Sequence, residues 1–185
     1  DAPNNWGPLE RIISRNLIAH CGKFGTHQWV FTPDVSARDL VTSLIMAWIL
    51  AVCTGNKIAT YLGDISGAFD RVFTDYLLAK LQAAGVGSQY LNFLEAYLQP
   101  RAGTVVVEGV CSEEFQLANT VFQGTVLGPP LWNVFFSDVI HCISIEQPVF
   151  FADDLTVFQQ FKRTEENESI KRHMHVCLIR VHKWG

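Results

Sequence analysis

Two adjacent aspartates, Asp153 and Asp154, interrupt one of the most apolar stretches of the chain, "PVFFADDLTVF" at residues 148–158. Two carboxylates about 4 Å apart repel each other by roughly 4 kcal/mol at an effective dielectric constant near 20. Neighbouring strand residues point to opposite faces, but a tight turn lets both side chains converge on one side. The plain alternative is an exposed hairpin turn, because aspartate is a favoured turn residue.

A third acid, Asp64, follows directly after the apolar residues of a predicted strand in "YLGDISGAFD". Carboxylate oxygens from two strands are suitable ligands for Mg²⁺, which keeps part of its coordination shell for substrate phosphates and water. Two such ions roughly 3.5–4 Å apart activate an attacking hydroxyl and stabilise a leaving pyrophosphate. Asp64, Asp153 and Asp154 therefore predict a centre for phosphoryl or nucleotidyl transfer.

A loop rich in glycine and proline lies between these acids, "VFQGTVLGPPLWNVFFSD" at residues 121–138. Gly124 and Gly128 permit close backbone approach. Gln123 stands at the mouth of a predicted helix and offers both a donor and an acceptor. Taken alone, the segment is also well explained as a loop that caps a helix.

The elements that must position these residues follow from apolar spacing and from turn signals. Helices are expected over 8–21, 40–52, 74–84, 88–99, 128–143 and 164–184. The expected N-caps are Ser36 or Asp39, Thr74 and Ser88. Strands are expected over 28–31 and from 57, with hairpins over 103–121 and 148–158. We treat residues 40–52 as a buried helix. This order predicts an α+β fold with a small antiparallel sheet backed by helices.

The composition is that of a globular protein, with 185 residues, 49% apolar and 17% charged. A formal net charge of -4 argues mildly against a large phosphate-binding footprint. The apolar run 40–52 is too short to span a bilayer, so no membrane association is expected. Five dispersed cysteines are typical of reduced core residues in an intracellular protein. His173, His175 and Cys177 do not suggest a zinc site, because side chains two apart on a helix diverge.

Together, three segments resemble the reverse transcriptase family, particularly the enzymes of non-LTR (LINE-type) retrotransposons. "YLGDISGAFDRV" is similar to motif A, "FQGTVLGPPLWNVFFSD" to motif B and "FFADDLTVF" to motif C. "LERIISRNLIAHCGKFGTHQWVFTPDVSARDLV" resembles the fingers region, in which a Gln-x-x-Phe-x-Pro stretch precedes a helix, and "VHKW" the start of motif D. The resemblance runs in order along nearly the whole chain, and three motifs in order are far more specific than an Asp-Asp pair alone.

The resemblance implies a role for each matching position. The metal set would be Asp64, Ile65, Asp153 and Asp154, holding two Mg²⁺ ions, with Mn²⁺ as an alternative. Phe69 would stack under the sugar and exclude a 2′-hydroxyl, although a plain core phenylalanine is the alternative. The other residues implied to bind the dNTP are Ile65, Ser66, Gly67, Ala68, Gln123, Gly124 and Arg38. Those implied to face primer and template are Phe151, Ala152, Gly128 and Pro129. Asp70 is expected to be a local hydrogen-bonding or capping residue.

The resemblance also implies a right-hand polymerase without its thumb. The fingers would span 1–56, the palm 57–72 and 123–185, and connecting helices and a hairpin 73–122. Thr32 and Val35 stand where the family usually carries arginines that grip the triphosphate. The motif D lysine and the thumb are expected beyond Gly185, and the family's endonuclease domain is absent from these residues. Oligomeric state does not follow from the sequence.

Three hypotheses remain open. The first is RNA-directed DNA polymerisation, with an RNA template, a DNA primer and dNTPs. The second is an inactive retroelement remnant that retains the fold, and the third is another palm-type enzyme such as a nucleotidyl cyclase. Motif B disfavours the third, because a cyclase has no template to position. We expect these residues alone to be weak or inactive in synthesis.

Overall fold

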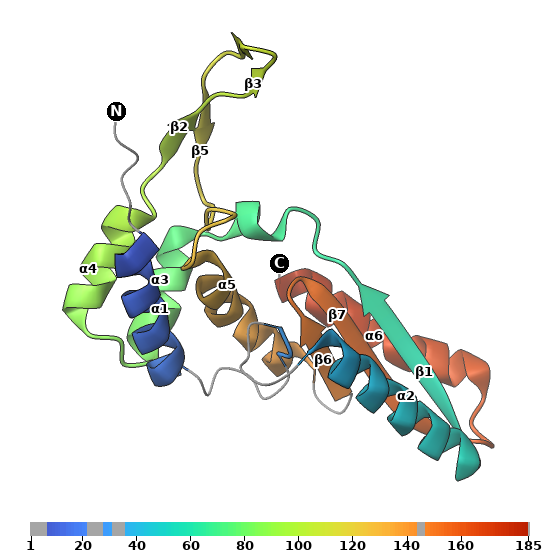
Figure 1. Cartoon of the computed structure of the whole chain (residues 1–185). Helices are drawn as coiled ribbons and strands as arrows, with labels where there is room; N and C mark the ends of the chain where they lie inside the picture. The colour runs from blue at the N-terminus through green and yellow to red at the C-terminus, as the bar shows by residue number, and fades with distance from the viewer. Residues whose placement is uncertain (1–6, 22–27, 31–35, 144–146, 185) are drawn as a thin grey trace. The chain divides into compact units, whose positions relative to one another are not determined.

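The structure is a computed structural model that describes residues 7–21, 28–30, 36–143 and 147–184. The chain forms two compact units, each built from two stretches of sequence. Unit 1 comprises Asp1–Lys23 and Gly67–Phe135, and unit 2 comprises Phe24–Ser66 and Phe136–Gly185. Helices mix with small antiparallel sheets, as the sequence predicted (Figure 1).

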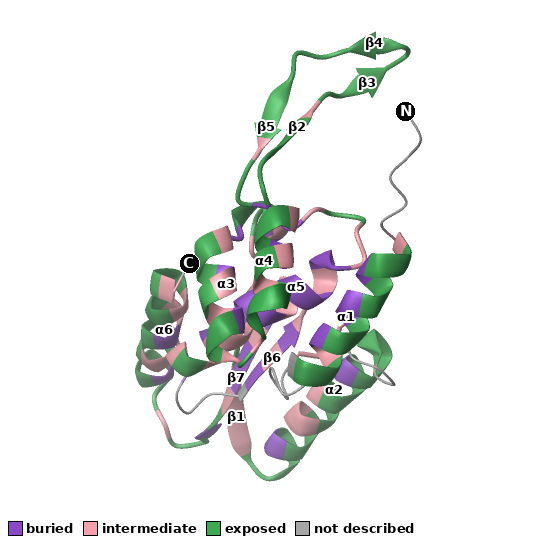
Figure 2. Ribbon diagram, turned by 90° about the vertical axis from the view of Figure 1, so that its left-hand side faces the viewer, coloured by how far each residue is buried: buried purple, intermediate pink, exposed green. Residues whose placement is uncertain are grey.

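Unit 2 is built on a three-stranded antiparallel sheet in the order β1-β7-β6. Its strands are β1 (Asn56–Gly63), β6 (Gln147–Phe151) and β7 (Asp154–Lys162). Helix α2 (Ala37–Cys53) and helix α6 (Asn167–Trp184) lie on opposite faces of this sheet (Figures 1 and 2). The core contains the rings of Phe136 and Phe150 at 5.2 Å and those of Phe136 and Trp184 at 5.4 Å. The 3-10 helix η2 (Ser137–Cys142) belongs to the same unit.

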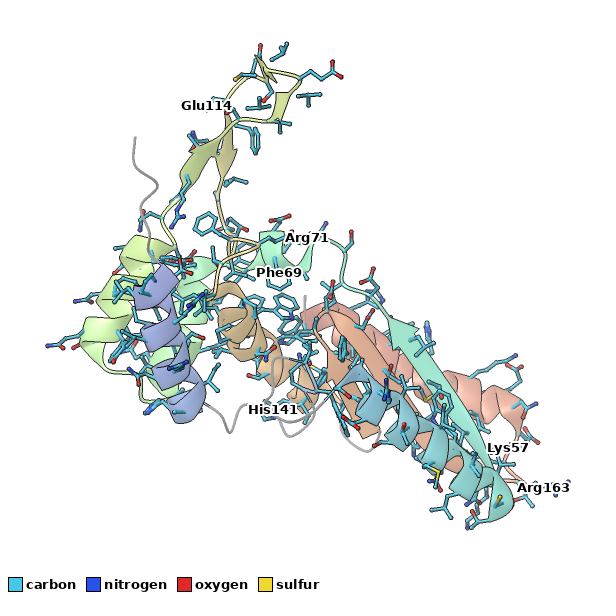
Figure 3. All side chains as sticks on the ribbon, viewed as in Figure 1. Lys57, Phe69, Arg71, Glu114, His141 and Arg163 are labelled. Atoms are coloured by element: carbon cyan, nitrogen blue, oxygen red, sulfur yellow. The ribbon has the colours of Figure 1, made fainter. Side chains whose placement is uncertain are left out.

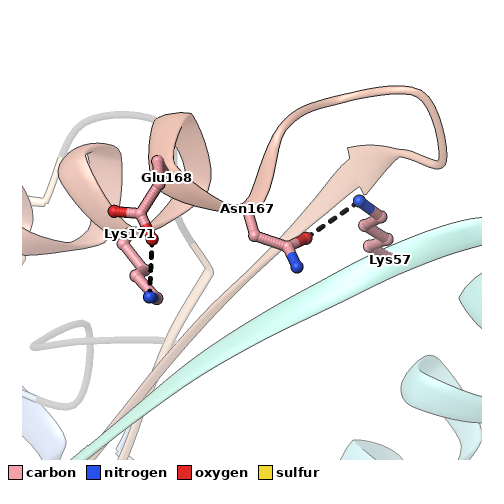
Figure 4. Close-up of polar contacts among 4 residues, drawn as sticks. All are labelled: Lys57, Asn167, Glu168 and Lys171. Atoms are coloured by element: carbon pink, nitrogen blue, oxygen red, sulfur yellow. Dashed lines mark hydrogen bonds and ion pairs between the residues drawn. The ribbon is translucent and has the colours of Figure 1, made fainter.

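The start of α6 is bound to β1 by one lysine. Lys57 donates hydrogen bonds to the Glu165 carbonyl at 2.6 Å and to Asn167 Oδ1 at 2.9 Å. Figure 4 shows the bond to Asn167 beside the i, i+3 ion pair of Lys171 and Glu168. Helix α6 begins at Asn167, three residues after the predicted start at Thr164.

Unit 1 packs helices around an apolar centre and carries a long hairpin. Its helices are α1 (Gly7–Cys21), η1 (Ala68–Arg71), α3 (Thr74–Ala83), α4 (Ser88–Tyr97) and α5 (Gly128–Phe136). The hairpin pairs β2 (Arg101–Gly103) with β5 (Phe115–Leu117), and β3 (Val106–Val107) with β4 (Val110–Cys111). The hairpin is almost entirely exposed (Figure 2), and Glu108 and Gly109 form its turn with φ of 50° and 82°.

Helix α2 exists where the sequence predicted it, but it is not a buried helix. Ser36 caps it and Asp39 completes a capping box, so both predicted candidates contribute to its start. Only Leu40 and Ala51 are buried, whereas Leu50 is 63% and Val52 65% exposed. A helix that is apolar all round can bury only one stripe against a single sheet face, so hydrophobicity alone overestimated its burial.

Other local predictions were also wrong in ways that have a physical cause. Thr74 and Ser88 are the first residues of α3 and α4, and the N-caps are Phe73 and Gly87. Both caps have extended backbones and no side-chain bond, so backbone geometry decided the boundary. The predicted strand 28–31 reduces to a single bridge from Gln28, since Gln28 Oε1 accepts the Val30 N–H and the chain turns there; residue 31 lies outside the described residues.

The cysteines are not uniformly core residues. Cys177 is buried and Cys142 is partly buried, but Cys53 and Cys111 are exposed, and all four are free thiols. None of the helices among the described residues is both long and apolar enough to cross a membrane.

Candidate active site

The pairing of β1 with β7 brings two of the three acids to one end of the sheet in unit 2. The antiparallel register ends with Gly63 opposite Leu155. Asp64 comes directly after Gly63, and Asp154 directly before Leu155. Because partners in an antiparallel ladder lie side by side, the backbones of Asp64 and Asp154 leave the same end of these strands.

The third acid, Asp153, lies in the two-residue turn that joins β6 to β7. The last pair of this hairpin is Phe151 with Asp154, so Ala152 and Asp153 form the turn. Ala152 has a φ of +56°, a left-handed conformation that costs a residue with a Cβ about 1–2 kcal/mol. The turn that carries Asp153, next to Asp154 at the start of β7, therefore needs support.

That support comes from Gln28, in a segment far away in the sequence. The side-chain amide of Gln28 donates from Nε2 to the Ala152 carbonyl at 3.3 Å. Its Oε1 accepts the Ala152 N–H at 3.2 Å. Beside it, the Trp29 N–H donates to the Phe150 carbonyl at 2.9 Å. Both backbone groups of the strained residue are thus bonded by one side chain.

Sequence reasoning missed this role of Gln28. The available signal was its place as the first residue of the Gln-x-x-Phe-x-Pro stretch, where a polar residue opens an otherwise apolar segment. Nothing in that stretch names Ala152 as its partner, because the contact joins residues 124 positions apart.

The side chains of the three acids differ in exposure, with Asp64 and Asp154 exposed and Asp153 partly buried. Within the described ranges, no group of three or more histidine, cysteine, aspartate or glutamate side chains is assembled to hold a metal ion. The donor types still fit a hard divalent cation, since all three candidate ligands at this end of the strands are carboxylates. The metal set that includes Ile65 stays a prediction.

The remaining motif A residues span the boundary between the units. Ile65 and Ser66 end a stretch of unit 2, while unit 1 resumes at Gly67, whose φ is +65°. Ala68 is buried. The ring of Phe69, labelled in Figure 3, stacks on Trp132 with centroids 5.5 Å apart. Phe69 is only partly buried, so both its sugar-sensing role and its core role remain consistent with the geometry.

Asp70 has a local structural role, as expected. Its Oδ1 accepts a hydrogen bond from Thr120 Oγ1 at 3.0 Å, and the same hydroxyl is 3.0 Å from the Phe69 carbonyl. The Val121 N–H donates to the Phe69 carbonyl at 2.9 Å. These bonds join motif A to the start of motif B within unit 1.

The motif B loop is tightly held, while its functional candidates are open to solvent. Thr125 Oγ1 donates to the Phe122 carbonyl at 2.6 Å and accepts the Gly128 N–H at 3.1 Å, which caps α5. A Cβ on Gly128 would lie 3.0 Å from the Phe122 carbonyl oxygen, so the close approach predicted for this glycine is confirmed, whereas a Cβ on Gly124 would have no described neighbour within 4 Å. Gln123 and Gly124 are exposed, and Gly124 has a φ of +82°.

The buried carboxylate of Glu10 holds this loop from α1. Glu10 is 8% exposed. Its Oε2 accepts the Val126 N–H at 2.9 Å, and its Oε1 accepts the Tyr97 hydroxyl at 3.2 Å. Burial raises the pKa of Tyr97 above its ordinary value of 10.0, and the hydrogen bond and charge of Glu10 act in the same direction. Glu10 is a second positioning residue that sequence reasoning missed.

The other candidate residues lie on described elements of the two units. Arg38 is exposed in the first turn of α2 in unit 2, and Phe151 is partly buried at the end of β6. Pro129 is in the first turn of α5 in unit 1, a position that proline tolerates. Thr32 and Val35 lie outside the described residues.

Comparison with known proteins shows the family to which the chain belongs. A family model described as "Reverse transcriptase (RNA-dependent DNA polymerase)" matches residues 8–185. The chain is 41% identical over 76 residues to an RNA-directed DNA polymerase from mobile element jockey of Drosophila melanogaster, covering 41% of this chain and 8% of that protein. It is 26% identical over 156 residues to a probable RNA-directed DNA polymerase from transposon X-element of the same organism, covering 80% and 17%.

A third relative is a Pol polyprotein from the type-1 retrotransposable element R2 of Popillia japonica, 27% identical over 108 residues that cover 52% of this chain and 18% of that protein. A telomerase structure from Candida albicans aligns with a TM-score of 0.49 and 12% identity over 95% of this chain and 31% of the other. The chain thus spans less than a fifth of each of these curated relatives. It belongs to the reverse transcriptase family, and its relatives are the polymerases of non-LTR retrotransposons, as the resemblance of its motifs predicted.

Proposed function

We propose that this chain carries the nucleotidyl-transfer site of an RNA-directed DNA polymerase, with Asp64, Asp153 and Asp154 as its acids. The observation that supports the proposal most is the register of β1 and β7, which ends with Gly63 opposite Leu155. Asp64 and Asp154 leave the same end of the sheet, and Asp153 occupies the adjoining turn. Membership of the reverse transcriptase family supplies the reaction class.

In the proposed reaction, the 3′-hydroxyl oxygen of a DNA primer attacks the α-phosphorus of a dNTP. A bond forms between that oxygen and phosphorus, the bond to the bridging oxygen breaks, and pyrophosphate leaves with the electron pair. Two Mg²⁺ ions, when bound, would lower the pKa of the attacking hydroxyl and offset charge on the pyrophosphate. Asp64 and Asp153 would hold them and Asp154 would assist, with Mn²⁺ as an alternative ion and Ile65 in the same set.

The other residues would position the substrates. Phe69, stacked on Trp132, would present its ring to the sugar of the incoming nucleotide and favour a deoxyribose. The run from Ile65 to Ala68 would lie beside the triphosphate, with Arg38 as a further phosphate ligand. Gln123 and Gly124 would line the nucleotide and template pocket. The primer and template would meet Phe151, Ala152, Gly128 and Pro129.

We assign the fingers to residues 1–56, the palm to 57–72 and 123–185, and the connecting helices and hairpin to 73–122.

The second candidate function is an inactive remnant of a retroelement polymerase. It is favoured by the sequence alone, where Thr32 and Val35 replace the arginines expected to grip the triphosphate. Charge-assisted bonds to phosphate are strong, so their loss weakens nucleotide binding.

Single-nucleotide incorporation on an RNA template tests the proposal. The chain is used in excess over a labelled DNA primer annealed to RNA, so that weak binding does not hide chemistry, with Mg²⁺ or Mn²⁺ added. We expect slow templated addition of one dNTP, and at least ~100-fold slower addition by Asp64→Asn or Asp153→Asn, since removing transition-state charge stabilisation costs about 10²–10³.

Asp75→Asn is the matched control, because Asp75 is an exposed acid in the first turn of α3, outside the proposed machinery. It is expected to leave the rate unchanged. Absence of incorporation with either ion would favour the remnant. Incorporation that survives Asp153→Asn would refute the assignment of the acids.

A further inference from the structure

The arginine at the base of the unit 1 hairpin is held in one conformation by its neighbours. Arg101 begins β2, opposite Leu117 of β5. Its guanidinium carbon lies 3.8 Å from the ring centroid of Phe122 and 5.1 Å from that of Tyr97. Its Nη2 donates to the Tyr97 carbonyl at 3.0 Å. The side chain is thus oriented before any ligand arrives, which reduces the entropy lost on binding.

The two rings that hold Arg101 are themselves fixed. Tyr97 packs edge-on against Phe122 at 6.0 Å and stacks with Phe93 at 6.0 Å. Its hydroxyl is bonded to the buried Glu10, whose other oxygen holds the Val126 N–H. This group of Glu10, Tyr97, Arg101 and Phe122, which we call the arginine platform, ties together α1, α4, β2 and the motif B loop.

Arg101 is the cationic member of the platform, and the Glu10 carboxylate is not its hydrogen-bond partner. Both carboxylate oxygens of Glu10 are engaged by other donors, and over the described ranges Arg101 forms no ion pair. A guanidinium has five N–H donors, of which the Tyr97 carbonyl takes one. The acids of the hairpin lie toward its other end, with Glu108 in the tip turn and Glu114 labelled near the top in Figure 3. Arg101 is exposed, and its remaining N–H donors have no hydrogen-bond partner among the described residues.

The position of the arginine platform beside the motif B loop indicates which ligand Arg101 would bind. Phe122, on which Arg101 stacks, is the residue immediately before Gln123, at the exposed turn of the motif B loop. In the proposed function, Gln123 and Gly124 line the nucleotide and template pocket. A phosphate bound at Arg101 would therefore be next to the templating base. Arginine that stacks on an aromatic ring and points its free donors outward is suited to single-stranded nucleic acid.

We propose that Arg101, oriented by Tyr97 and Phe122, binds a backbone phosphate of the unpaired template strand where it enters the polymerase. This inference rests on the proposed function and adds a residue to it. The motif comparison assigns no template contact to Arg101. The incoming triphosphate offers the same phosphate chemistry, so the test separates the two sources.

The test measures binding by fluorescence anisotropy without nucleotide. One probe is a labelled DNA primer on an RNA template with a single-stranded 5′ overhang, and the other is the blunt duplex of the same primer. Arg101→Met keeps the apolar stem against Phe122 and removes the charge, whereas Arg101→Lys keeps the charge and loses the planar fork. Arg163→Met is the control, because Arg163 is an exposed arginine in the turn between β7 and α6 of unit 2 (Figure 3).

We expect Arg101→Met to weaken binding of the overhang probe by roughly tenfold and to reduce the log–log salt slope by about 0.7, the value for one single-strand phosphate. The affinity of Arg101→Lys for the overhang probe should lie between those of Arg101→Met and the unsubstituted chain, and its salt slope should equal that of the unsubstituted chain. The blunt duplex should bind both variants and the unsubstituted chain alike. Arg163→Met should match the unsubstituted chain with both probes, and thermal unfolding should show that Arg101→Met is folded.

Several results would overturn the inference. An unchanged salt slope with weaker binding that lysine does not restore would make Arg101 a support for the loop only. An equal loss on the blunt duplex would place its contact on paired nucleic acid, and a raised KM for dNTP with normal overhang binding would place it on the triphosphate. In each of these cases the Asp153→Asn result stands, so the proposed function survives. If the unsubstituted chain binds neither probe, this inference fails, while the incorporation assay, which uses excess chain, decides the proposed function separately.

Discussion

Gln28→Ala should loosen the turn that carries Asp153. The substitution removes the bond to the Ala152 carbonyl at 3.3 Å and the bond to its N–H at 3.2 Å. Both distances are at the long end for N–H···O bonds, so we take about 0.5 kcal/mol for each. The left-handed strain of Ala152 is present with and without the Gln28 side chain, so it does not add to the loss. The expected loss is therefore about 1 kcal/mol, or roughly fivefold in the opening equilibrium.

Amide hydrogen exchange at Ala152, followed by NMR, measures that opening directly and does not require polymerase activity. We expect exchange to accelerate by this factor, and kcat for single-nucleotide incorporation to fall by at most the same factor, since Gln28 acts through the turn. Gln116→Ala is the matched control, because Gln116 is an exposed glutamine on β5 with no side-chain hydrogen bond among the described residues.

Ala152→Gly provides a second check. Glycine adopts positive φ without a Cβ penalty, so the double variant Gln28→Ala with Ala152→Gly should recover part of the lost protection and rate. If Gln28→Ala leaves both Ala152 exchange and kcat unchanged, the turn is held by other contacts and the role given to Gln28 is wrong.

Two further predictions concern stability. Leu81→Ala should lower the free energy of unfolding by about 2–5 kcal/mol, because Leu81 is 0% exposed. Leu50→Ala, on the open side of α2, should change it by no more than about 0.5 kcal/mol. Urea titration measures both values, and equal losses would mean that α2 is covered in solution. The raised pKa of Tyr97 means that the folded state favours the neutral phenol, so its contribution is complete below pH 10.0 and is lost as the pH rises through the higher pKa of the folded protein. Unfolding measured from pH 8 to 11.5 should therefore show a decline that is shallower in Tyr97→Phe, and identical slopes would contradict the burial of this hydroxyl.

The elements that the sequence predicted best were those with a strong local pattern. Apolar spacing located the helices, and the Glu108-Gly109 turn located its hairpin, because these signals act within a few residues. The caps of α3 and α4 were misplaced by one residue, since a threonine or serine near a helix start does not reveal which backbone is extended. The apolar run of α2 revealed its helix but not what would cover it.

The candidate site was predictable only in its residue types. The three acids could be identified from their positions beside strands, yet the register that places Asp64 and Asp154 at one end depends on pairing between distant segments. The sequence did not reveal the partners of Gln28 and Glu10, because Ala152 and Val126 are more than 100 residues away from them. Supporting contacts of this kind depend on the tertiary fold, which periodicity does not encode.

The exposed hairpin of unit 1 has a consequence for handling the protein. Val105, Val106 and Val107 are more than half exposed, and Val110 on the returning strand is 72% exposed. Both strands of a two-stranded ribbon are edges, so short β-prone runs of this kind are templates for intermolecular cross-β assembly. Glutamates interrupt the run at three places, Glu108, Glu113 and Glu114, and act as electrostatic gatekeepers against stacking of one molecule on another. Storage near the sequence pI of about 5.8 would remove the net repulsion between molecules, so precipitation should be fastest there.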